Sequence, residues 1–254
     1  TGNVALGDTA LDSVTSGTNN TAVGANAGTA ITTGKDNTAV GTNALAANTT
    51  ADFNTAIGRN ALAVNTTGYE NLADGAYALS ANTTGSCNTA VGISSLSVNT
   101  TANYNTAVGN NALAFNTTAS NNTAVGYQAG YSNTTGTITA VGNQAGYSNT
   151  TGTLNTALGE SSLYTNSTGT RNTALGRSAL QSATTANDNT GTGFAALNAA
   201  TTGASNTANG SYALYNTTTA SENTAVGYQA GYSNTTGAEN TGIGYGALRS
   251  TTTS

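Results

Sequence analysis

The chain of 254 residues contains no histidine, proline, methionine or tryptophan, and its one cysteine is Cys87. Without histidine the commonest general base is missing, and a nucleophilic cysteine would have no such base beside it. A lone cysteine also excludes a disulfide within the chain. Cysteine–histidine metal sites are excluded for the same reason, and the acidic residues do not recur at calcium-loop spacing. We therefore predict no catalytic residue, no cofactor and no metal site in a protein that is not an enzyme.

Charge is scarce as well, because charged residues make up 6% of the chain and the net charge is −5. Such a chain lacks the basic footprint of a nucleic-acid-binding protein, so we expect no nucleic-acid partner. No apolar run approaches the ~18 residues of a membrane-spanning helix, so we expect no membrane insertion. Where charges fall in equivalent places of the repeat described next, their signs mostly alternate, as in Lys35 and Asp52, Glu160 and Arg177, and Arg171 and Asp188.

Asparagine, threonine, alanine and glycine form a 17-residue repeat that opens with a variant of Asn-Thr-Ala-Val-Gly. One step, from Asn122 to Ile138, is 16 residues. Internal repetition of this kind is typical of a solenoid in which each repeat is one coil stacked on its neighbours. We predict one continuous domain over residues 1–254, with coils that start at residues 3, 20, 37, 54, 71, 88, 105, 122, 138, 155, 172, 189, 206, 223 and 240.

We number the repeat from its opening asparagine as positions 1 to 17. Position 5 is glycine in every repeat, which indicates a corner with positive φ or a close backbone approach. Positions 3 and 8 are almost always alanine, which indicates a tight interior. Threonine and asparagine are poor helix formers, and no apolar stripe with a 3.6-residue period appears. These features predict an all-β fold, a β-solenoid of about fifteen 17-residue coils with three short strands in each coil.

Position 4 is usually valine, leucine or isoleucine. Positions 3 and 4 are adjacent in a strand and should point to opposite faces. If the alanines face inward, position 4 forms an exposed apolar column that a soluble monomer rarely shows. We therefore expect a parallel homotrimer around this column; the alternative is a bend that turns both positions inward. The expected interface residues are Val23, Val40, Ile57, Val91, Val108, Val125, Val141, Leu158, Leu175 and Val226.

Threonine forms three further columns, at positions 2, 13 and 14. Ranks of hydroxyl and methyl groups on flat β-solenoids are the surfaces by which several ice-binding proteins meet ice. The usual arrangement has two outward threonines separated by one inward residue. Positions 13 and 14 are adjacent, so at most one of these two columns faces outward.

Tyrosines also align at the repeat spacing. Stacked and exposed, they would form a platform for sugar rings; alternatively, each tyrosine folds over a neighbouring glycine and replaces the leucine missing from position 9. The candidate glycan-contact residues are Tyr131, Tyr147, Tyr164, Tyr215, Tyr232, Tyr228 and Tyr245.

The phrase Asn-Thr-Ala-Val-Gly-Tyr-Gln-Ala-Gly-Tyr-Ser-Asn-Thr-Thr-Gly occurs at residues 122–136 and again at 223–237. It resembles repeat shafts of bacteriophage and bacterial tail-fibre-like proteins. The Asn-x-Ala-Val-Gly core is also similar to repeats in the heads of trimeric autotransporter adhesins, whose coils are shorter than 17 residues. The resemblance covers essentially the whole chain and implies an extracellular, homotrimeric β-solenoid used for reach and attachment.

Together these observations predict a structural shaft of an extracellular fibre, either a phage tail fibre on the virion or a bacterial surface adhesin in cell adhesion. Its expected partners are other copies of itself, with a cell-surface glycan or receptor as a further partner. The alternative function is an ice-binding or glycan-binding solenoid that acts through a flat threonine or tyrosine face.

Overall fold

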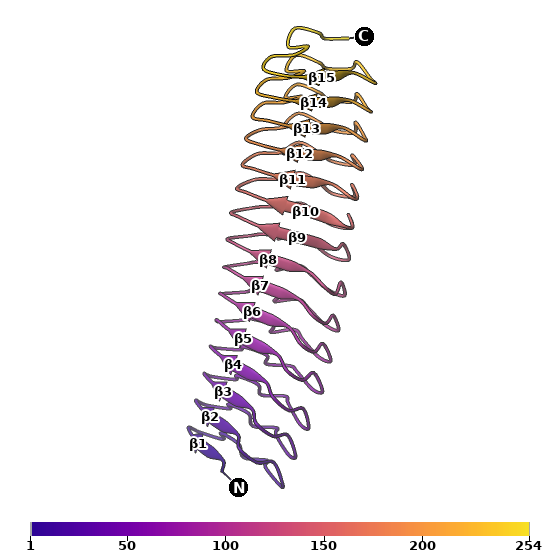
Figure 1. Cartoon of the computed structure of the whole chain (residues 1–254). Helices are drawn as coiled ribbons and strands as arrows, with labels where there is room; N and C mark the ends of the chain where they lie inside the picture. The colour runs from indigo at the N-terminus through magenta and orange to yellow at the C-terminus, as the bar shows by residue number, and fades with distance from the viewer. Residues whose placement is uncertain (1, 254) are drawn as a thin grey trace. The chain divides into compact units, whose positions relative to one another are not determined.

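A computed structural model describes residues 2–253, which contain fifteen β-strands and no helix. The chain forms two compact units, the first ending at Val125 and the second beginning at Gly126. Each unit is a parallel β-solenoid in which one 17-residue repeat makes one coil (Figure 1). The predicted all-β solenoid is therefore confirmed. The single continuous domain over residues 1–254 and the homotrimer stay predictions.

Each coil contributes one short strand. Unit 1 contains β1 (Val4–Leu6), β2 (Thr21–Val23), β3 (Thr38–Val40), β4 (Thr55–Ile57), β5 (Leu72–Asp74), β6 (Thr89–Val91), β7 (Thr106–Val108) and β8 (Thr123–Val125). Unit 2 contains β9 (Ile138–Val141), β10 (Asn155–Leu158), β11 (Thr173–Leu175), β12 (Thr190–Thr192), β13 (Thr207–Asn209), β14 (Thr224–Val226) and β15 (Thr241–Ile243).

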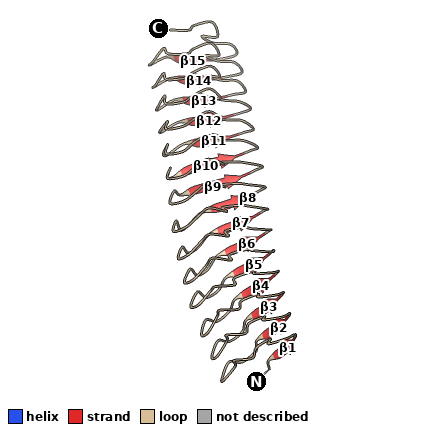
Figure 2. Ribbon diagram, turned by 180° about the vertical axis from the view of Figure 1, so that it is seen from behind, coloured by secondary structure: helices blue, strands red, loops and turns tan. Residues whose placement is uncertain are grey.

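Within each unit, consecutive strands pair in parallel and equivalent repeat positions face each other. Thr38 pairs with Thr55 between β3 and β4, and Thr156 pairs with Thr173 between β10 and β11. The strands lie along the same side of successive coils, and turns make up the rest of each coil (Figure 2). The step of 16 residues before Ile138 leaves the register of unit 2 intact, because Ile138 pairs with Asn155 at position 1.

The core is narrow and is filled by small side chains. Alanine at positions 3 and 8 is buried, as at Ala157 and Ala179, and leucine at position 9 is buried, as at Leu163. Because neighbouring strand residues alternate in direction, the inward alanine at position 3 sends positions 2 and 4 outward. The tight interior predicted from the repeated alanines is confirmed.

The prediction of three strands per coil is wrong, because each coil has a single strand, at positions 2 to 4 or, in β9 and β10, at positions 1 to 4. Positions 7, 9 and 17 have positive φ even where they carry side chains, as at Asn43 (φ 58°), Leu45 (φ 53°) and Phe53 (φ 60°). A left-handed residue breaks the extended conformation that a strand needs. The turns still bond to the next coil, for example from the Leu45 N–H to the Ala61 carbonyl at 3.0 Å.

Glycine at position 5 forms the predicted corner, with φ between 122° and 147° throughout. This region of φ strongly favours glycine. The corner glycines of successive coils also approach each other closely: a Cβ added to Gly159 would lie 2.6 Å from the carbonyl carbon of Gly176. The glycine therefore serves both the backbone conformation and the stacking distance.

Two ladders of buried asparagine amides run inside the coils. At position 1, the Asn88 amide donates to the Asn71 side-chain oxygen at 3.1 Å and to the Ala102 carbonyl across the same coil at 2.8 Å. At position 12, the Asn82 amide donates to the Asn65 oxygen at 2.8 Å and to the Gly85 carbonyl at 2.9 Å. Buried polar groups need such partners, so these ladders fix the stacking register while they satisfy the interior.

Candidate functional site

The outer face of the strands is a surface that recurs in every coil. We call the side chains at positions 2 and 4 the strand face. All ten predicted interface residues project from it and are exposed or half-buried: Val23, Val40, Ile57, Val91, Val108, Val125, Val141, Leu158, Leu175 and Val226. Leu158 and Leu175 are each 42% exposed, so the alternative in which position 4 bends inward is wrong. The strand face therefore presents a column of aliphatic side chains at the surface of the coils.

The threonine columns differ in what their hydroxyl groups do. Position 13 is half-buried in most coils, and its hydroxyl commonly donates to the position-13 carbonyl of the next coil, as Thr184 does to Thr201 at 3.1 Å. Position 14 is exposed, as at Thr185. The prediction that at most one of these two columns faces outward is confirmed. The outward pair that flanks an inward residue is instead formed by positions 2 and 4, which the inward alanine at position 3 indicates.

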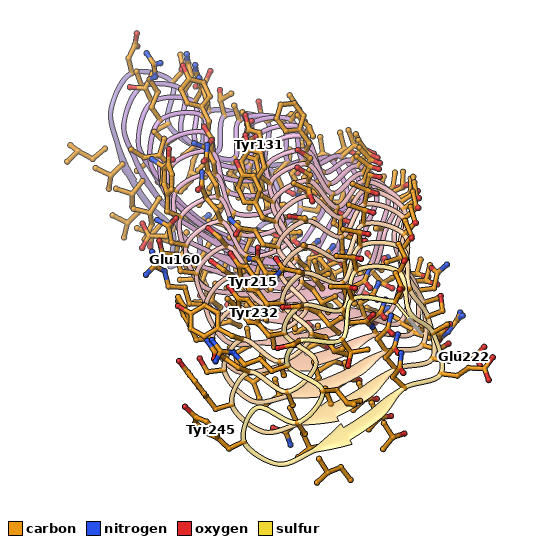
Figure 3. The ribbon with its side chains drawn as sticks, turned by 90° about the horizontal axis from the view of Figure 1, so that it is seen from above. Tyr131, Glu160, Tyr215, Glu222, Tyr232 and Tyr245 are labelled. Carbon is orange, nitrogen blue, oxygen red and sulfur yellow. The ribbon has the colours of Figure 1, made fainter. Side chains whose placement is uncertain are left out.

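The predicted tyrosine columns lie in unit 2 as stacks of rings. Tyr147 stacks between Tyr131 and Tyr164, with ring centroids 5.0 and 5.1 Å away. Tyr215 and Tyr232 stack at 5.3 Å, and Tyr228 and Tyr245 stack at 5.4 Å. Figure 3 shows Tyr215 and Tyr232 on one side of the coil, Tyr245 at one corner, and Glu222 at a different corner.

Two of these tyrosine stacks meet at Tyr212, a residue that the sequence analysis did not select. Its ring lies edge-to-face against Phe194, Tyr215, Tyr228 and Tyr232, with centroid distances between 5.1 and 6.4 Å. Tyr212 occupies position 7, where most repeats have a smaller side chain. Aligning the repeat positions alone does not reveal this cluster. The tyrosine ring at position 7 is large enough to contact rings at positions 6 and 10.

Stacking determines what the tyrosine columns present to a ligand. Both faces of the Tyr147 ring are covered by its neighbours. Burial raises the pKa of the Tyr147 phenol, and the nearby hydroxyl groups of Tyr131, Tyr164 and Tyr127 add to the effect. The space beside Gly146 is occupied by the side chain of Ile138. Inside a stack only ring edges and hydroxyl groups remain accessible, so a glycan contact by these tyrosines stays a prediction.

Most charged side chains lie at the corners of the coils, and Asp74 in β5 is an exception. Arg171 and Asp188 form a two-pronged ion pair, at 2.5 Å from Nε to Oδ1 and 2.8 Å from Nη2 to Oδ2. The hydrogen bond from Arg171 holds the pKa of Asp188 below its ordinary value. Arg177 and Glu160 pair at 3.3 Å. Two of the three opposite-sign pairs named from the sequence therefore form ion pairs between successive coils, whereas in the third the Lys35 backbone N–H donates to the Asp52 carboxylate at 2.7 Å.

The Cys87 thiol lies 3.6 Å from a carboxylate oxygen of Glu70. Burial raises the pKa of this thiol, and the hydrogen bond to Glu70 raises it further, so the reactive thiolate is disfavoured. No group of three or more histidine, cysteine, aspartate or glutamate residues is gathered for a metal ion within residues 2–253. In the same part of the chain, no helix has the length and apolar character needed to cross a membrane.

Unit 1 carries a surface hollow at a corner of the coils that the sequence analysis did not predict. It is lined by Thr50, Ala51, Asp52, Phe53, Thr67, Tyr69 and Glu70. These residues come from positions 14 to 17 of two successive repeats, and the side chains at positions 16 and 17 vary along the chain. The hollow is therefore local to two coils, whereas the strand face recurs in every coil of unit 2.

The strand face thus recurs from coil to coil, whereas the tyrosine stacks are confined to a few coils of unit 2. A scan of protein-family models finds no match to the chain, and no curated protein matches it in sequence.

Proposed function

We propose that the chain is a structural shaft of an extracellular fibre, in a phage tail fibre or a bacterial surface adhesin. The observation that carries the proposal is that successive coils repeat the same backbone structure and the same bonds to their neighbours. In each unit every coil bonds to the next through its strand, its turns and its internal asparagine amides. The resemblance of residues 122–136 and 223–237 to tail-fibre repeat shafts supports the extracellular location.

Stacked coils suit a mechanical role because each coil contacts only its neighbours, so length is set by the number of coils. Each buried amide hydrogen bond contributes about 0.5–1.5 kcal/mol, and removing one partner costs more because a buried polar group is left unpaired. Opening one coil therefore requires breaking its hydrogen bonds to the coils on both sides. This is the property expected of a spacer that holds an attachment site away from a surface.

The location is tested by electron microscopy with gold-labelled antibodies raised against the purified chain. We expect label along filaments on the outside of virions or cells. Label confined to the cytoplasm of the producing cell would contradict the proposal.

The spacer role is tested separately by deleting residues 88–121, which are two whole repeats. We expect a folded protein and shorter filaments of unchanged width. The matched control deletes residues 88–95, which breaks the period and should prevent stacking. Filaments of unchanged length after the whole-repeat deletion would show that these coils do not set the reach.

A further inference from the structure

The strand face of unit 2 consists of two parallel ranks. Position 2 is threonine in every coil of this unit: Thr139, Thr156, Thr173, Thr190, Thr207, Thr224 and Thr241. Position 4 supplies Val141, Leu158, Leu175, Thr192, Asn209, Val226 and Ile243. Six of the seven position-2 threonines are exposed and Thr224 is half-buried, and no side chain in either rank is charged. Unit 1 departs from this pattern at β5, where Leu72 and Asp74 stand at the two positions.

The fold does not use the hydroxyl groups of the position-2 threonines. None of them makes a side-chain hydrogen bond within residues 2–253, whereas position-13 hydroxyl groups such as that of Thr150 donate to the next coil. Valine has the same shape as threonine and suits a strand equally well. A threonine retained where packing needs no hydroxyl leaves a donor and two acceptor lone pairs directed to solvent.

The two ranks form a regular array. Strand pairing places Thr156 beside Thr173 and Leu158 beside Leu175 without a register shift. Neighbouring strands are about 4.8 Å apart, and positions 2 and 4 are separated by two residues of about 3.3 Å each. Because the inward alanines pack in a narrow core, each strand is held firmly. Methyl groups and hydroxyl oxygens therefore recur at fixed spacings in two directions.

We propose that the strand face of unit 2 binds ice. Each threonine hydroxyl can donate to and accept from lattice water, while its methyl group and the neighbouring aliphatic side chains fit against the lattice without competing for hydrogen bonds. A charged group would hold its own hydration shell, and the two ranks contain none. Each contact is weak, but a rigid array makes many of them without ordering any flexible part. The inference does not depend on the shaft role.

A second copy of the chain is the competing occupant of this face. Burying a hydroxyl against another protein surface is unfavourable unless each hydroxyl finds a partner. In a sheet pressed against an identical sheet, the position-4 aliphatic groups such as Leu158 and Leu175 would have to meet each other while the threonine rank found partners separately. An ice surface offers a partner to every hydroxyl in the rank, so the unbroken threonine column favours ice.

The direct test uses the whole unmodified chain. During slow growth of polycrystalline ice from a dilute solution, we expect the chain to be enriched in the ice, to create a gap between melting and freezing temperatures and to keep ice grains small on annealing. A chain excluded from ice, with no temperature gap and no effect on grain size, would overturn the proposal. This readout requires no variant to fold.

The face is identified by a pair of double variants in the same two coils. Thr173→Tyr with Thr190→Tyr places bulky rings on the strand face, and we expect it to abolish ice enrichment. The control, Thr185→Tyr with Thr202→Tyr, alters the exposed position-14 column and should retain ice enrichment. Equal loss in both would show that the strand face is not the binding surface. Circular dichroism establishes that each variant is folded.

Light scattering on the same samples separates the two occupants. We expect both double variants to have the same oligomeric state as the wild-type chain. A trimer that dissociates only when the strand face carries Thr173→Tyr and Thr190→Tyr would assign this face to self-association and overturn the proposal.

Discussion

Ile138 fills the space that the absence of a side chain at Gly146 leaves in the same coil. A Cβ on Gly146 would overlap Cδ1 of Ile138, which is buried at position 1 where other repeats have asparagine. Gly146 is at position 9, where most repeats have leucine. The coil that starts at Asn155 shows the usual pair, with Asn155 at position 1 and Leu163 at position 9. In this coil, isoleucine at position 1 and glycine at position 9 therefore replace the usual asparagine and leucine.

This exchange predicts non-additive substitutions. Ile138→Asn alone removes the side chain that fills the space beside Gly146 and should destabilise the chain. Gly146→Leu alone should also destabilise, because the leucine would overlap Ile138. The double variant restores the usual pair and should be more stable than either single variant. Urea unfolding of all four proteins measures the coupling, and additive effects would contradict the compensation.

The position-12 amide ladder predicts an unequal cost for two similar truncations. Asn82→Ala removes the donor that the Asn65 oxygen accepts at 2.8 Å, and it removes the acceptor of the Asn99 amide at 2.8 Å. A buried oxygen left without a partner costs about 1–3 kcal/mol. We expect Asn82→Ala to lower the urea midpoint clearly.

Asn166→Ala is the matched control. The Asn166 oxygen is already without a partner, because Ala183 stands where the next coil would supply an amide. The acceptors of its own amide, the Asn149 oxygen and the Gly169 carbonyl, also accept from Asn155 at 3.1 and 2.7 Å. Asn166→Ala therefore leaves no new unpaired group and should cost less than Asn82→Ala. An equal or larger cost would show that the ladder bonds do not set stability.

The position-5 glycines predict a contrast between an inner and a terminal coil. Alanine at Gly159 (φ 131°) would strain the backbone and place its Cβ within 2.6–2.9 Å of backbone atoms of Gly176 and Arg177. Alanine at Gly244 (φ 122°) carries a comparable strain of about 1–3 kcal/mol but meets nothing within 4 Å. We expect thermal unfolding to show a much larger loss for Gly159→Ala. Similar losses would mean that conformation alone requires these glycines.

The ion pair of Arg171 and Asp188 predicts a pH dependence. The pKa of Asp188 is lowered in the folded chain by its hydrogen bond from Arg171. Its stabilisation is therefore fully present above the ordinary aspartate value of 3.8 and is lost as the pH falls through the lower folded value. The raised pKa of Arg171 has no effect in this range, since arginine stays protonated.

Comparing the wild-type chain with Asp188→Asn isolates this contribution from those of the other carboxylates. We expect the stability difference between the two proteins to be present at neutral pH, to shrink in acid and to shrink in high salt, because the pair is exposed. A difference that does not change with pH would rule out the pair as its source. Urea midpoints across the pH range supply the measurement.

The sequence predicts the solenoid because the periodic pattern is independent of turn geometry. Invariant glycine at position 5 and alanine at position 3 suffice to place corners and interior. The turns are less predictable, because Leu45 and Phe53 adopt left-handed φ values that such side chains rarely take alone. Backbone hydrogen bonds to neighbouring coils hold these residues in that conformation. The Tyr212 cluster and the exchange at Ile138 depend on side-chain reach in three dimensions, which a list of positions does not contain.

The most direct test of the account is the accessibility of three adjacent strand positions in β10. Cysteine is introduced singly at Thr156, Ala157 or Leu158 in a chain that carries Cys87→Ser, and the rate of thiol alkylation is measured under native conditions. We predict rapid labelling at positions 156 and 158 and strong protection at 157, because Ala157 alone is buried and the strand face is uncovered. Protection at 158 together with 157 would contradict the account, because it would mean that position 4 is turned inward or covered by another chain.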